Sequence, residues 1–339
     1  MAEAAPCEHS SLMAEEAEPE ATALWIVERN RAALRRCAIE RPNRGEVTVE
    51  SAYGAISRGT EALVAAGSVP ESEWQRMRAP FQEGAFPFPV KYGYGTVGRV
   101  VGGDEDRSGE WVFCLYPHQD RFVVPGEAAV PVPRAVAPER AVLAANMETA
   151  LNVVWDGGIL PGDRVAVIGG GVVGLLVGFL AARIPATQTV VVDVNSARAK
   201  VAGALGVGFV GPGELPRDCD VVVHASASEA GLASAIDAAG VGARVVEASW
   251  YGERTPSVPL GGAFHSRRLS IIGSQVGRVP AARAPRWSNR RRLETALGLL
   301  ADQRLDALFS GETRFAELAA CYGEILADPA TLCHRIRYD

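Results

Sequence analysis

A glycine-rich turn at Gly169–Gly174 is the feature of this sequence that most constrains its fold. The turn follows a short apolar run, 165–168, and precedes a longer apolar stretch, 172–182, so it joins a buried strand to a helix. Glycines at G-x-G-x-x-G spacing permit a tight turn, a close approach of the backbone to a pyrophosphate, and close packing of the helix on its strand. The amino end of such a helix offers unpaired N–H groups to phosphate oxygens. The sequence therefore predicts a dinucleotide-binding Rossmann domain.

An acidic residue further along the chain indicates which dinucleotide binds. Asp193 ends a second apolar run, where a carboxylate accepts hydrogen bonds from the adenosine ribose and repels the 2′-phosphate of NADP. NAD is therefore favoured over NADP. Arg198, which follows, is interpreted as a solvated helix residue rather than a phosphate ligand. The predicted cofactor-binding residues are Gly169, Gly171, Val172, Val173, Gly174 and Asp193.

The patterning of the 339 residues predicts two domains, because a chain of this length exceeds one comfortable hydrophobic core. Short β-like runs broken by Gly, Pro and Asp predict an antiparallel, barrel-like domain over 22–145. Apolar runs separated by helical stretches predict an open parallel sheet over 146–285. Helical segments in 286–339 are expected to return to the first domain. The predicted strands of the parallel sheet are 165–168, 189–192, 220–224, 243–248 and 269–272.

Charge is concentrated at the amino terminus. Residues 1–21 contain six glutamates and no Lys or Arg, which equals the formal net charge of −6, so we predict a disordered acidic tail on a near-neutral body. Such a body lacks a general footprint for nucleic acid. No segment approaches the ~20 apolar residues that cross a bilayer, and no secretory signal is recognised, so a cytoplasmic location is expected. An arginine-rich run, 278–292, is interpreted as a solvated surface or subunit contact, although it could also bind a phosphorylated substrate or the cofactor pyrophosphate.

The order of the predicted domains resembles the medium-chain dehydrogenase/reductase superfamily. The matching segments are 54–61 (GAISRGTE), 89–98 (PVKYGYGTVG), 150–154 (ALNVV), 161–165 (PGDRV) and the glycine turn. The S-x-G-T-E variant is similar to a branch that includes the bacteriochlorophyllide hydroxyethyl dehydrogenases. The resemblance implies an α/β fold with a GroES-like β-barrel domain before the doubly wound Rossmann sheet. It also implies a nicotinamide cofactor, a small-molecule substrate and a homodimer formed by edge pairing of Rossmann sheets.

Departures from the zinc-dependent members of that superfamily bear on the chemistry. The resemblance places Ser57 where those enzymes have a zinc-ligand Cys, Tyr94 where they have a ligand His, and Glu148 near the third ligand. A catalytic zinc takes three suitable protein ligands, so no metal is expected. An unusual site built from Glu61, His118 and Glu148 is the alternative. The six cysteines are scattered without a C-x-x-C pair, which predicts neither a structural zinc site nor a disulfide framework.

Without a metal, side chains have to stabilise charge on the substrate oxygen and supply a proton. The resemblance places Ser57, Thr60, Lys91, Tyr92 and Tyr94 on segments around the nicotinamide, and all of these except Tyr92 are the catalytic candidates. Tyr94 is the first choice for the group that bonds the substrate oxygen, and Thr60 matches the relay hydroxyl of the family. Ser57 is expected to line the same pocket, and the ammonium of Lys91, if buried, would have a lowered pKa and could act as an acid. In the structural alternative Tyr94 is a core aromatic, and the two hydroxyls cap a turn.

The predicted substrate contacts are Arg58, His118 and Glu148. Arg58 could hold an anionic group or pair with Glu61, and His118 could equally be a hydrogen-bonded structural histidine. We therefore predict an NAD-dependent, zinc-independent oxidoreductase that interconverts a secondary alcohol and a ketone on a polar, cyclic metabolite. Cyclitol, sugar, pterin and tetrapyrrole ketones all suit this prediction. The alternatives are reduction of an activated carbon–carbon double bond and dinucleotide binding without turnover.

Overall fold

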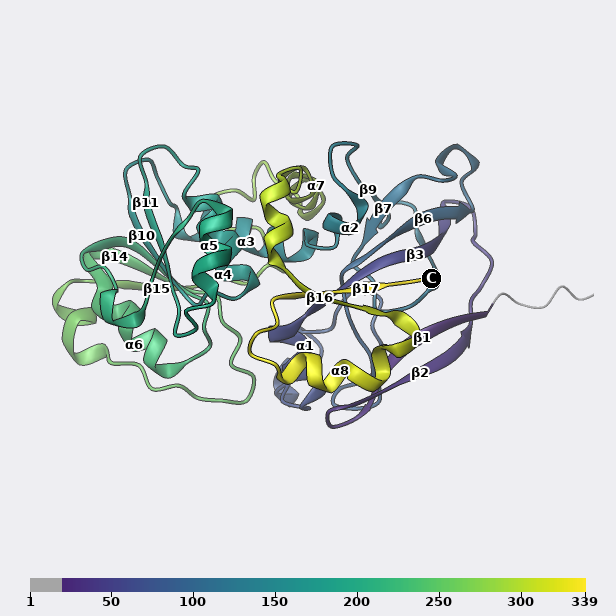
Figure 1. Cartoon of the computed structure of the whole chain (residues 1–339), viewed down its shortest axis with the longest axis horizontal. Helices are drawn as coiled ribbons and strands as arrows, with labels where there is room; N and C mark the ends of the chain where they lie inside the picture. The colour runs from purple at the N-terminus through teal and green to yellow at the C-terminus, as the bar shows by residue number, and fades with distance from the viewer. Residues whose placement is uncertain (1–19) are drawn as a thin grey trace, which may run out of the picture.

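The computed structural model describes residues 20–339, which form a β-rich domain and a Rossmann domain side by side (Figure 1). The predicted acidic tail, 1–21, lies outside the described residues except for Glu20 and Ala21. These two residues begin strand β1, Glu20–Glu28, so the predicted boundary of the tail is too late by two residues. None of the helices in the described part is both long and apolar enough to cross a membrane.

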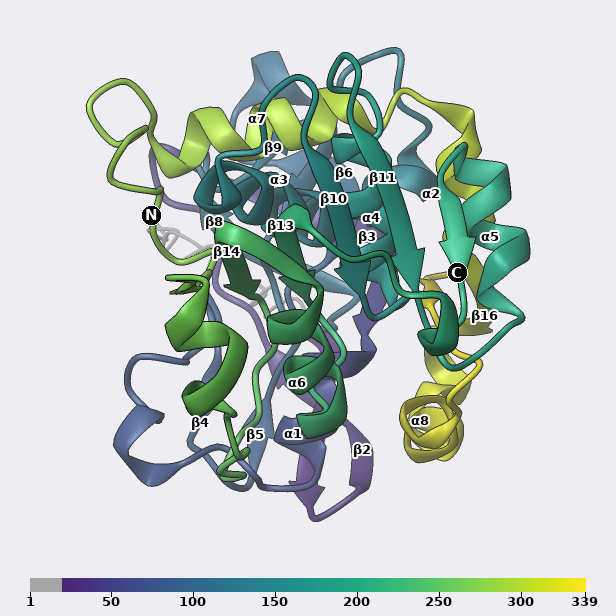
Figure 2. The same ribbon diagram turned by 90° about the vertical axis from the view of Figure 1, so that its left-hand side faces the viewer.

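The Rossmann domain contains a six-stranded parallel sheet in the order β12-β11-β10-β13-β14-β15. All five predicted strands are present, and the sheet gains β12, which is too short to show an apolar run. Figure 2 shows the central strands running side by side. The strands are β10 (Arg164–Ile168), β11 (Gln188–Val192), β12 (Gly208–Val210), β13 (Cys219–His224), β14 (Ala239–Glu247) and β15 (Ser270–Gly273).

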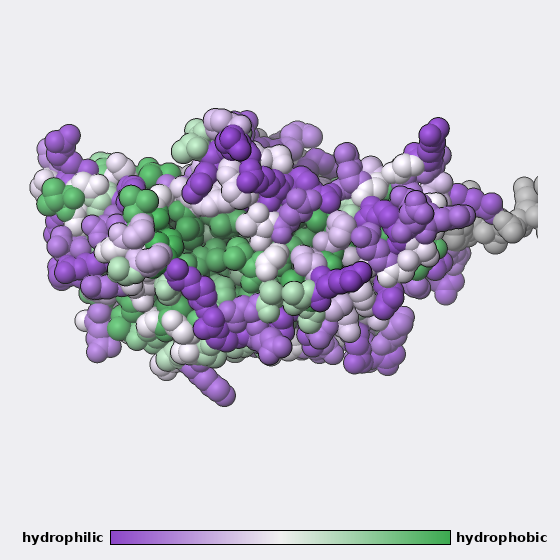
Figure 3. Space-filling model, turned by 90° about the horizontal axis from the view of Figure 1, so that it is seen from above, coloured by the Kyte–Doolittle hydropathy of each residue, from purple (hydrophilic) through white to green (hydrophobic). Residues whose placement is uncertain are grey.

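Helices cover both faces of this sheet, because alternate residues of a strand point to opposite sides. Val165 and Val167 of β10 pack into one core with α3, α4 and α7, whereas Ala166 and Ile168 pack into another with α6. The helices are α3 (Ala144–Gly157), α4 (Val172–Ala181), α5 (Arg198–Leu205), α6 (Glu229–Ala238) and α7 (Asn289–Leu299). On the face seen in Figure 3, hydrophobic residues gather over the Rossmann domain and hydrophilic ones surround them.

The first domain is built mainly from antiparallel strands, as predicted. A four-stranded sheet has the order β2-β1-β5-β4, and a seven-stranded sheet has the order β16-β17-β3-β6-β7-β9 with β8 beside β3. The long strand β3 leads directly into helix α1, Arg58–Ala65, and so positions the start of that helix at the domain junction. The remaining amino-terminal elements are β2 (Arg31–Ala38), β3 (Glu46–Ser57), β4 (Glu83–Gly84), β5 (Val90–Lys91), β6 (Thr96–Gly102), β7 (Trp111–Cys114), β8 (Arg121–Pro125), β9 (Val130–Pro131) and α2 (Pro138–Ala141).

The carboxyl-terminal segment returns to the first domain, as the sequence analysis expects. Strand β17, Cys333–Arg337, pairs antiparallel with β3, so that Cys333 lies opposite Ser57. Strand β16, Phe309–Arg314, extends the sheet beyond β17, and helix α8, Leu318–Ala327, packs against α1. The helices were predicted, but the two strands were not. Because the carboxyl-terminal segment pairs with the first domain, residues 331 and 332 lie at the junction between the domains.

Candidate active site

A cleft of about 460 Å³ lies between the two domains. Its first-domain wall is formed by the start of α1 and by Tyr94, and α3 contributes Asn146 and Thr149. Its Rossmann wall is formed by the glycine turn and by the segments that follow β13 and β14. Doubly wound sheets bind ligands in the crevice outside the carboxyl ends of their strands, so this cleft is the expected place for a nucleotide and its reaction partner.

The glycine turn has the geometry that its three roles require. Gly169 has a φ of 112°, and a Cβ there would lie 2.7 Å from the backbone of Ala225. A Cβ on Gly171 would meet nothing within 4 Å, so that backbone faces open space, whereas one on Gly174 would lie 1.9 Å from the carbonyl oxygen of Gly169. Helix α4 begins directly after Gly171 without a side-chain cap, which leaves its first N–H groups available to an anion.

Asp193 lies against this turn. Its Oδ2 accepts a hydrogen bond from the Gly170 N–H at 2.6 Å, and its Oδ1 accepts one from the Asn195 N–H at 2.7 Å. The carboxylate is therefore fixed beside the turn, at the end of β11. Of the predicted cofactor residues, the four that line the cleft are Gly171, Val172, Val173 and Gly174. Gly169 and Asp193 are not lining residues, and Asp193 is hydrogen-bonded to the turn through the Gly170 N–H.

The prediction that Arg198 is solvated is wrong. Its side chain is buried, and its terminal nitrogens donate to the carbonyl oxygens of Pro329 at 2.6 Å and Ala330 at 3.0 Å. Burial lowers the pKa of Arg198. This arginine ties the returning carboxyl-terminal segment to the Rossmann domain and is not free to meet a phosphate.

Three of the four predicted catalytic residues come together in the cleft. Tyr94 lies between β5 and β6 and lines the cleft together with Ser57 and Thr60, whose hydroxyls act to lower the pKa of its phenol. Asn146 extends this cluster, because its Nδ2 donates to Ser57 Oγ at 3.3 Å. Burial raises the pKa of Tyr94 to about 12. The carboxylate of Glu61 adds to this rise, and the side chains of Ser57 and Thr60 oppose it. The phenol is therefore a neutral hydrogen-bond donor at ordinary pH.

The buried carboxylate of Glu61 lies next to this cluster. Glu61 is 0% exposed and accepts hydrogen bonds from the Ser57 N–H at 2.7 Å and from the Tyr322 hydroxyl at 2.8 Å. His118 Nε2 lies 2.9 Å from the same carboxylate. His118 is fully buried and does not line the cleft, so its surroundings match a hydrogen-bonded structural histidine rather than a substrate contact.

Arg58 does not form the predicted pair with Glu61, whose oxygens are taken by the groups just described. Its Nε donates to the Leu326 carbonyl oxygen at 3.0 Å, and the residue lines the cleft. Lys91, in contrast, is outside the cleft. Its ammonium contacts Glu83, donates to Gln119 Oε1 at 2.7 Å, and lies over the ring of Tyr116. Lys91 thus stabilises the first domain and cannot reach a ligand in the cleft.

Glu148 also faces away from the cleft. Arg292 Nε donates to its carboxylate at 3.0 Å, and Arg292 Nη1 donates to Asn152 Oδ1 at 2.5 Å. Burial raises the pKa of Glu148, and Arg292 opposes that rise. Arg292 is only 2% exposed, so the prediction that the whole arginine-rich run is solvated is wrong for this member. The predicted substrate contact by Glu148 has no counterpart in the cleft.

The donor set does not fit a catalytic zinc ion. Of the three positions that the resemblance aligns with zinc ligands, two hold hydroxyls, Ser57 and Tyr94, and Glu148 is bound by Arg292. The alternative set of Glu61, His118 and Glu148 is divided, because the first two belong to one cluster and Glu148 to another. Within residues 20–339, no group of three or more His, Cys, Asp or Glu side chains could hold a metal ion.

A second buried network fixes the segments that follow β13 and β14. His224 Nε2 lies 2.7 Å from Ser226 Oγ, and its Nδ1 lies 2.8 Å from Glu247 Oε2. Burial would raise the pKa of Glu247, but hydrogen bonds from His224 and Ser249 hold it below its ordinary value. The carboxylate therefore stays ionised and anchors both segments at the edge of the cleft.

Sequence reasoning missed several residues that line the cleft. Asn146 and Thr149 lie on α3, whose sequence carries several polar residues and gives no signal that singles these two out. Ser249, Trp250 and Arg254 follow β14, in a segment without a motif, and reach the cleft only through the order of strands in the sheet.

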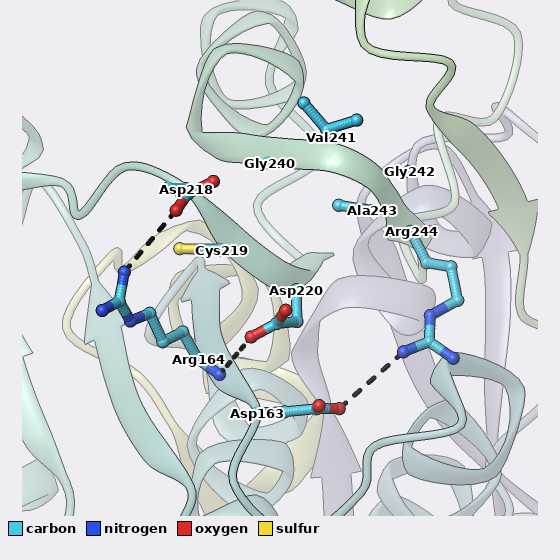
Figure 4. A pocket seen from close by; sticks show the side chains of 10 residues that line it. All are labelled: Asp163, Arg164, Asp218, Cys219, Asp220, Gly240, Val241, Gly242, Ala243 and Arg244. Atoms are coloured by element: carbon cyan, nitrogen blue, oxygen red, sulfur yellow. Dashed lines mark hydrogen bonds and ion pairs between the residues drawn. The ribbon is translucent and has the colours of Figure 1, made fainter.

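A second cavity, of about 340 Å³, lies at the amino ends of the Rossmann strands (Figure 4). Its charged groups interact with one another. Arg164 lies 3.7 Å from Asp218, its backbone N–H donates to Asp220, and Arg244 lies 3.7 Å from Asp163. These contacts pair both arginines of the cavity with aspartates, and the cavity is at the opposite end of the sheet from the glycine turn.

The comparisons with known proteins agree with this geometry. No protein-family model matches the sequence. A D-guloside 3-dehydrogenase from Escherichia coli K12 is 26% identical over 286 residues, which are 75% of this chain and 81% of that protein. An alcohol dehydrogenase from E. coli CFT073 in complex with NADH superposes with a TM-score of 0.74 at 18% identity, covering 94% of this chain and 99% of the other. The structure of L-idonate 5-dehydrogenase from E. coli K-12 superposes with a TM-score of 0.77 at 15% identity. The match covers 94% of this chain and 98% of that one. These structures confirm the predicted fold class.

Proposed function

We propose that this chain, which has the fold of the medium-chain dehydrogenase/reductase superfamily, is a nicotinamide-dependent dehydrogenase that interconverts a secondary alcohol and a ketone. One observation carries the proposal. A dinucleotide turn at Gly169–Gly174 and a cluster of hydroxyl groups from Ser57, Thr60 and Tyr94 face the same cleft. A bound nicotinamide supplies or accepts a hydride there, and the hydroxyl cluster provides the hydrogen-bond donors that the other half of the reaction needs.

The residues around the turn fit NAD. The backbone at Gly171 and the start of α4 face the cleft without side chains that would block a pyrophosphate. Asp193 holds a carboxylate beside the turn, where it favours ribose hydroxyls and opposes a 2′-phosphate. Arg198, the cation nearest in sequence, donates to backbone carbonyls instead. These contacts support NAD over NADP.

Tyr94 is the proposed donor to the substrate oxygen. A pKa of about 12 keeps its phenol protonated at neutral pH, so it can donate a hydrogen bond as negative charge develops on that oxygen. The side chains of Ser57 and Thr60 lie beside the phenol in the cleft, and Asn146 donates a hydrogen bond to Ser57. Because the ligand positions of zinc enzymes are occupied by this hydroxyl cluster, we propose that the reaction does not use zinc.

The lining of the cleft supports a polar substrate with an apolar ring face. Asn146, Thr149 and Ser249 offer groups that hydrogen-bond to hydroxyls, and Trp250 offers an aromatic surface. The similarity to a D-guloside 3-dehydrogenase agrees with a sugar-like or cyclitol-like alcohol. We place the reacting carbon near Tyr94 and the rest of the substrate toward Trp250.

The experiment is a screen of NADH consumption with purified protein. Ketones of cyclitols, sugars, pterins and tetrapyrroles are offered beside matched enones, and NADH binding is measured separately by fluorescence. The proposal expects oxidation of NADH by at least one cyclic ketone. Faster reduction of the enones would indicate carbon–carbon double-bond reduction instead. NADH binding without consumption by any compound would contradict the proposal.

A further inference from the structure

The cleft carries positive charge without negative charge. Arg58 and Arg254 line it, and no aspartate or glutamate is among its lining residues. The six glutamates of residues 1–21 equal the formal net charge of −6, so the cleft is positively charged on a body that is near-neutral. A cleft of one sign concentrates ligands of the opposite sign. The two arginines therefore indicate that anionic groups bind in this cleft.

The two arginines belong to different halves of the cleft. Arg58 Nε donates to the carbonyl oxygen of Leu326, three residues before the Pro329 carbonyl that Arg198 binds, so Arg58 lies on the side of Arg198 and Asp193. That is the side of β11, where the adenosine ribose is expected. Arg254 follows β14, and β14 lies on the other side of the central strand β10 from β11. A dinucleotide that crosses the turn from β11 brings its nicotinamide toward β13 and β14, and so toward Arg254.

Two contacts with Tyr251 position the guanidinium of Arg254, which is an exposed residue. Its Nε donates to the Tyr251 carbonyl oxygen at 3.3 Å, and its central carbon lies 5.5 Å from the centre of the Tyr251 ring. Tyr251 is fixed in turn, because its hydroxyl donates to Glu247 at 3.3 Å, and Glu247 is bound by the buried His224. The hydrogen bonds that link His224, Glu247 and Tyr251 thus help to position Arg254 at the opening of the cleft.

The terminal nitrogens of Arg254 are left without an acceptor. Within residues 20–339 they have no hydrogen-bond partner, and Arg254 forms no ion pair. Two nearby carboxylates bind other groups, since Glu229 accepts from the Ser257 N–H at 3.1 Å and Glu247 lies 2.8 Å from His224 Nδ1. An arginine held through Nε presents its two terminal nitrogens as a fork that matches the oxygens of a carboxylate or a phosphate.

The segment that carries Arg254 is also fixed to the first domain. Gly252 has a φ of 62°, and a Cβ there would lie 2.6 Å from the Ser68 carbonyl oxygen and 3.0 Å from Leu63. Trp250 packs on the core of the first domain and lines the cleft. The position of Arg254 is therefore set relative to Tyr94 as well as to the Rossmann domain.

We propose that Arg254 binds a carboxylate or phosphate group of the substrate, so that the enzyme acts on anionic sugar-like or cyclitol-like alcohols. The proposal rests on the proposed dehydrogenase function and adds its substrate class. The anionic group binds at the mouth of the cleft, Trp250 contacts the adjoining carbons, and the reacting carbon reaches Tyr94.

The test compares three six-carbon probes, D-glucitol, D-gluconate and D-glucitol 6-phosphate, with NAD and the purified full-length chain. Wild-type kcat/KM is expected to be at least about tenfold higher for one of the two anions than for glucitol. Arg254→Gln is expected to raise KM for that anion by about 10- to 100-fold while changing kcat little, and to raise KM for neutral glucitol far less. Arg121→Gln, which removes a partly exposed arginine outside the cleft, is the matched control.

Failure of this inference differs from failure of the proposed function. Equal turnover of charged and neutral probes, or an anion KM that Arg254→Gln does not change, would overturn the inference and leave a dehydrogenase. If no probe is turned over, calorimetric titration of gluconate and glucitol 6-phosphate into the NADH complex decides the inference. Binding that is lost in Arg254→Gln supports it. No binding, or equal binding by both proteins, overturns it.

Discussion

Arg292 donates a hydrogen bond from Nε to Glu148 at 3.0 Å, and both side chains are buried where α7 packs against α3. This pair fastens the carboxyl-terminal segment to the helix that leads into the Rossmann domain. It also engages the carboxylate of Glu148, which is not among the residues that line the cleft.

Arg292→Met is expected to lower the free energy of unfolding by about 3 kcal/mol, because it leaves the buried carboxylate of Glu148 without a partner. Urea denaturation measures the effect. Arg286→Met, at an exposed position of the same run, is the control and should cost little. Replacing both Glu148 and Arg292 by Met should restore part of the loss. Equal stability of the two single variants would show that the pair does not stabilise the fold.

Gly174→Ala is expected to weaken NADH binding by at least about tenfold, because the new Cβ would lie 1.9 Å from the Gly169 carbonyl oxygen and push the turn open. Gly203→Ala, in helix α5, has open space around the new Cβ and serves as the control. NADH fluorescence titration compares the two. A normal dissociation constant for Gly174→Ala would mean that the turn does not hold the cofactor.

Asp193→Ser is expected to weaken NADH binding and to lower the ratio of the NADPH dissociation constant to that of NADH. The serine hydroxyl cannot bind both ribose hydroxyls of NADH, and it does not repel the 2′-phosphate of NADPH. Asp193→Asn keeps the shape and removes the charge, so it separates repulsion from hydrogen bonding. The ratio of the two dissociation constants is the measurement. An unchanged ratio in both variants would remove Asp193 from cofactor discrimination.

Local spacing made much of this fold predictable. The glycine turn, the apolar runs and Asp193 lie within one short stretch of chain, and each has a backbone role that the sequence alone specifies. Ser57, Thr60 and Tyr94 came from a resemblance, and the structure brings them together.

The failures share a physical cause, which is pairing between distant parts of the chain. Arg292 and Glu148 are 144 residues apart, and Arg198 is 131 residues from the carbonyl oxygen of Pro329 that it binds. No local pattern distinguishes such buried arginines from solvated ones. Strand β12 has only three residues, and Arg254 reaches the cleft only because β14 lies beside β13.

Tyr94→Phe is expected to lower kcat for ketone reduction by about 100-fold or more, because the substrate oxygen loses its proton donor. In the wild type the donor is present below its pKa of about 12, so the contribution of Tyr94 should be constant from pH 6 to pH 10 and should fall as the pH approaches 12. Thr149→Val, which also changes the lining of the cleft, is the control. Steady-state pH profiles check both statements. Unchanged kinetics in Tyr94→Phe would remove Tyr94 from the mechanism.

The central claim is that hydroxyl groups, and not a metal ion, manage the charge on the substrate oxygen. Its most direct test measures the zinc content and the ketone reductase activity of the same protein sample before and after treatment with a chelator. The account predicts turnover that is unchanged by the chelator in protein with far less than one zinc per chain. One equivalent of zinc whose removal abolishes activity, and whose return restores it, would contradict the account.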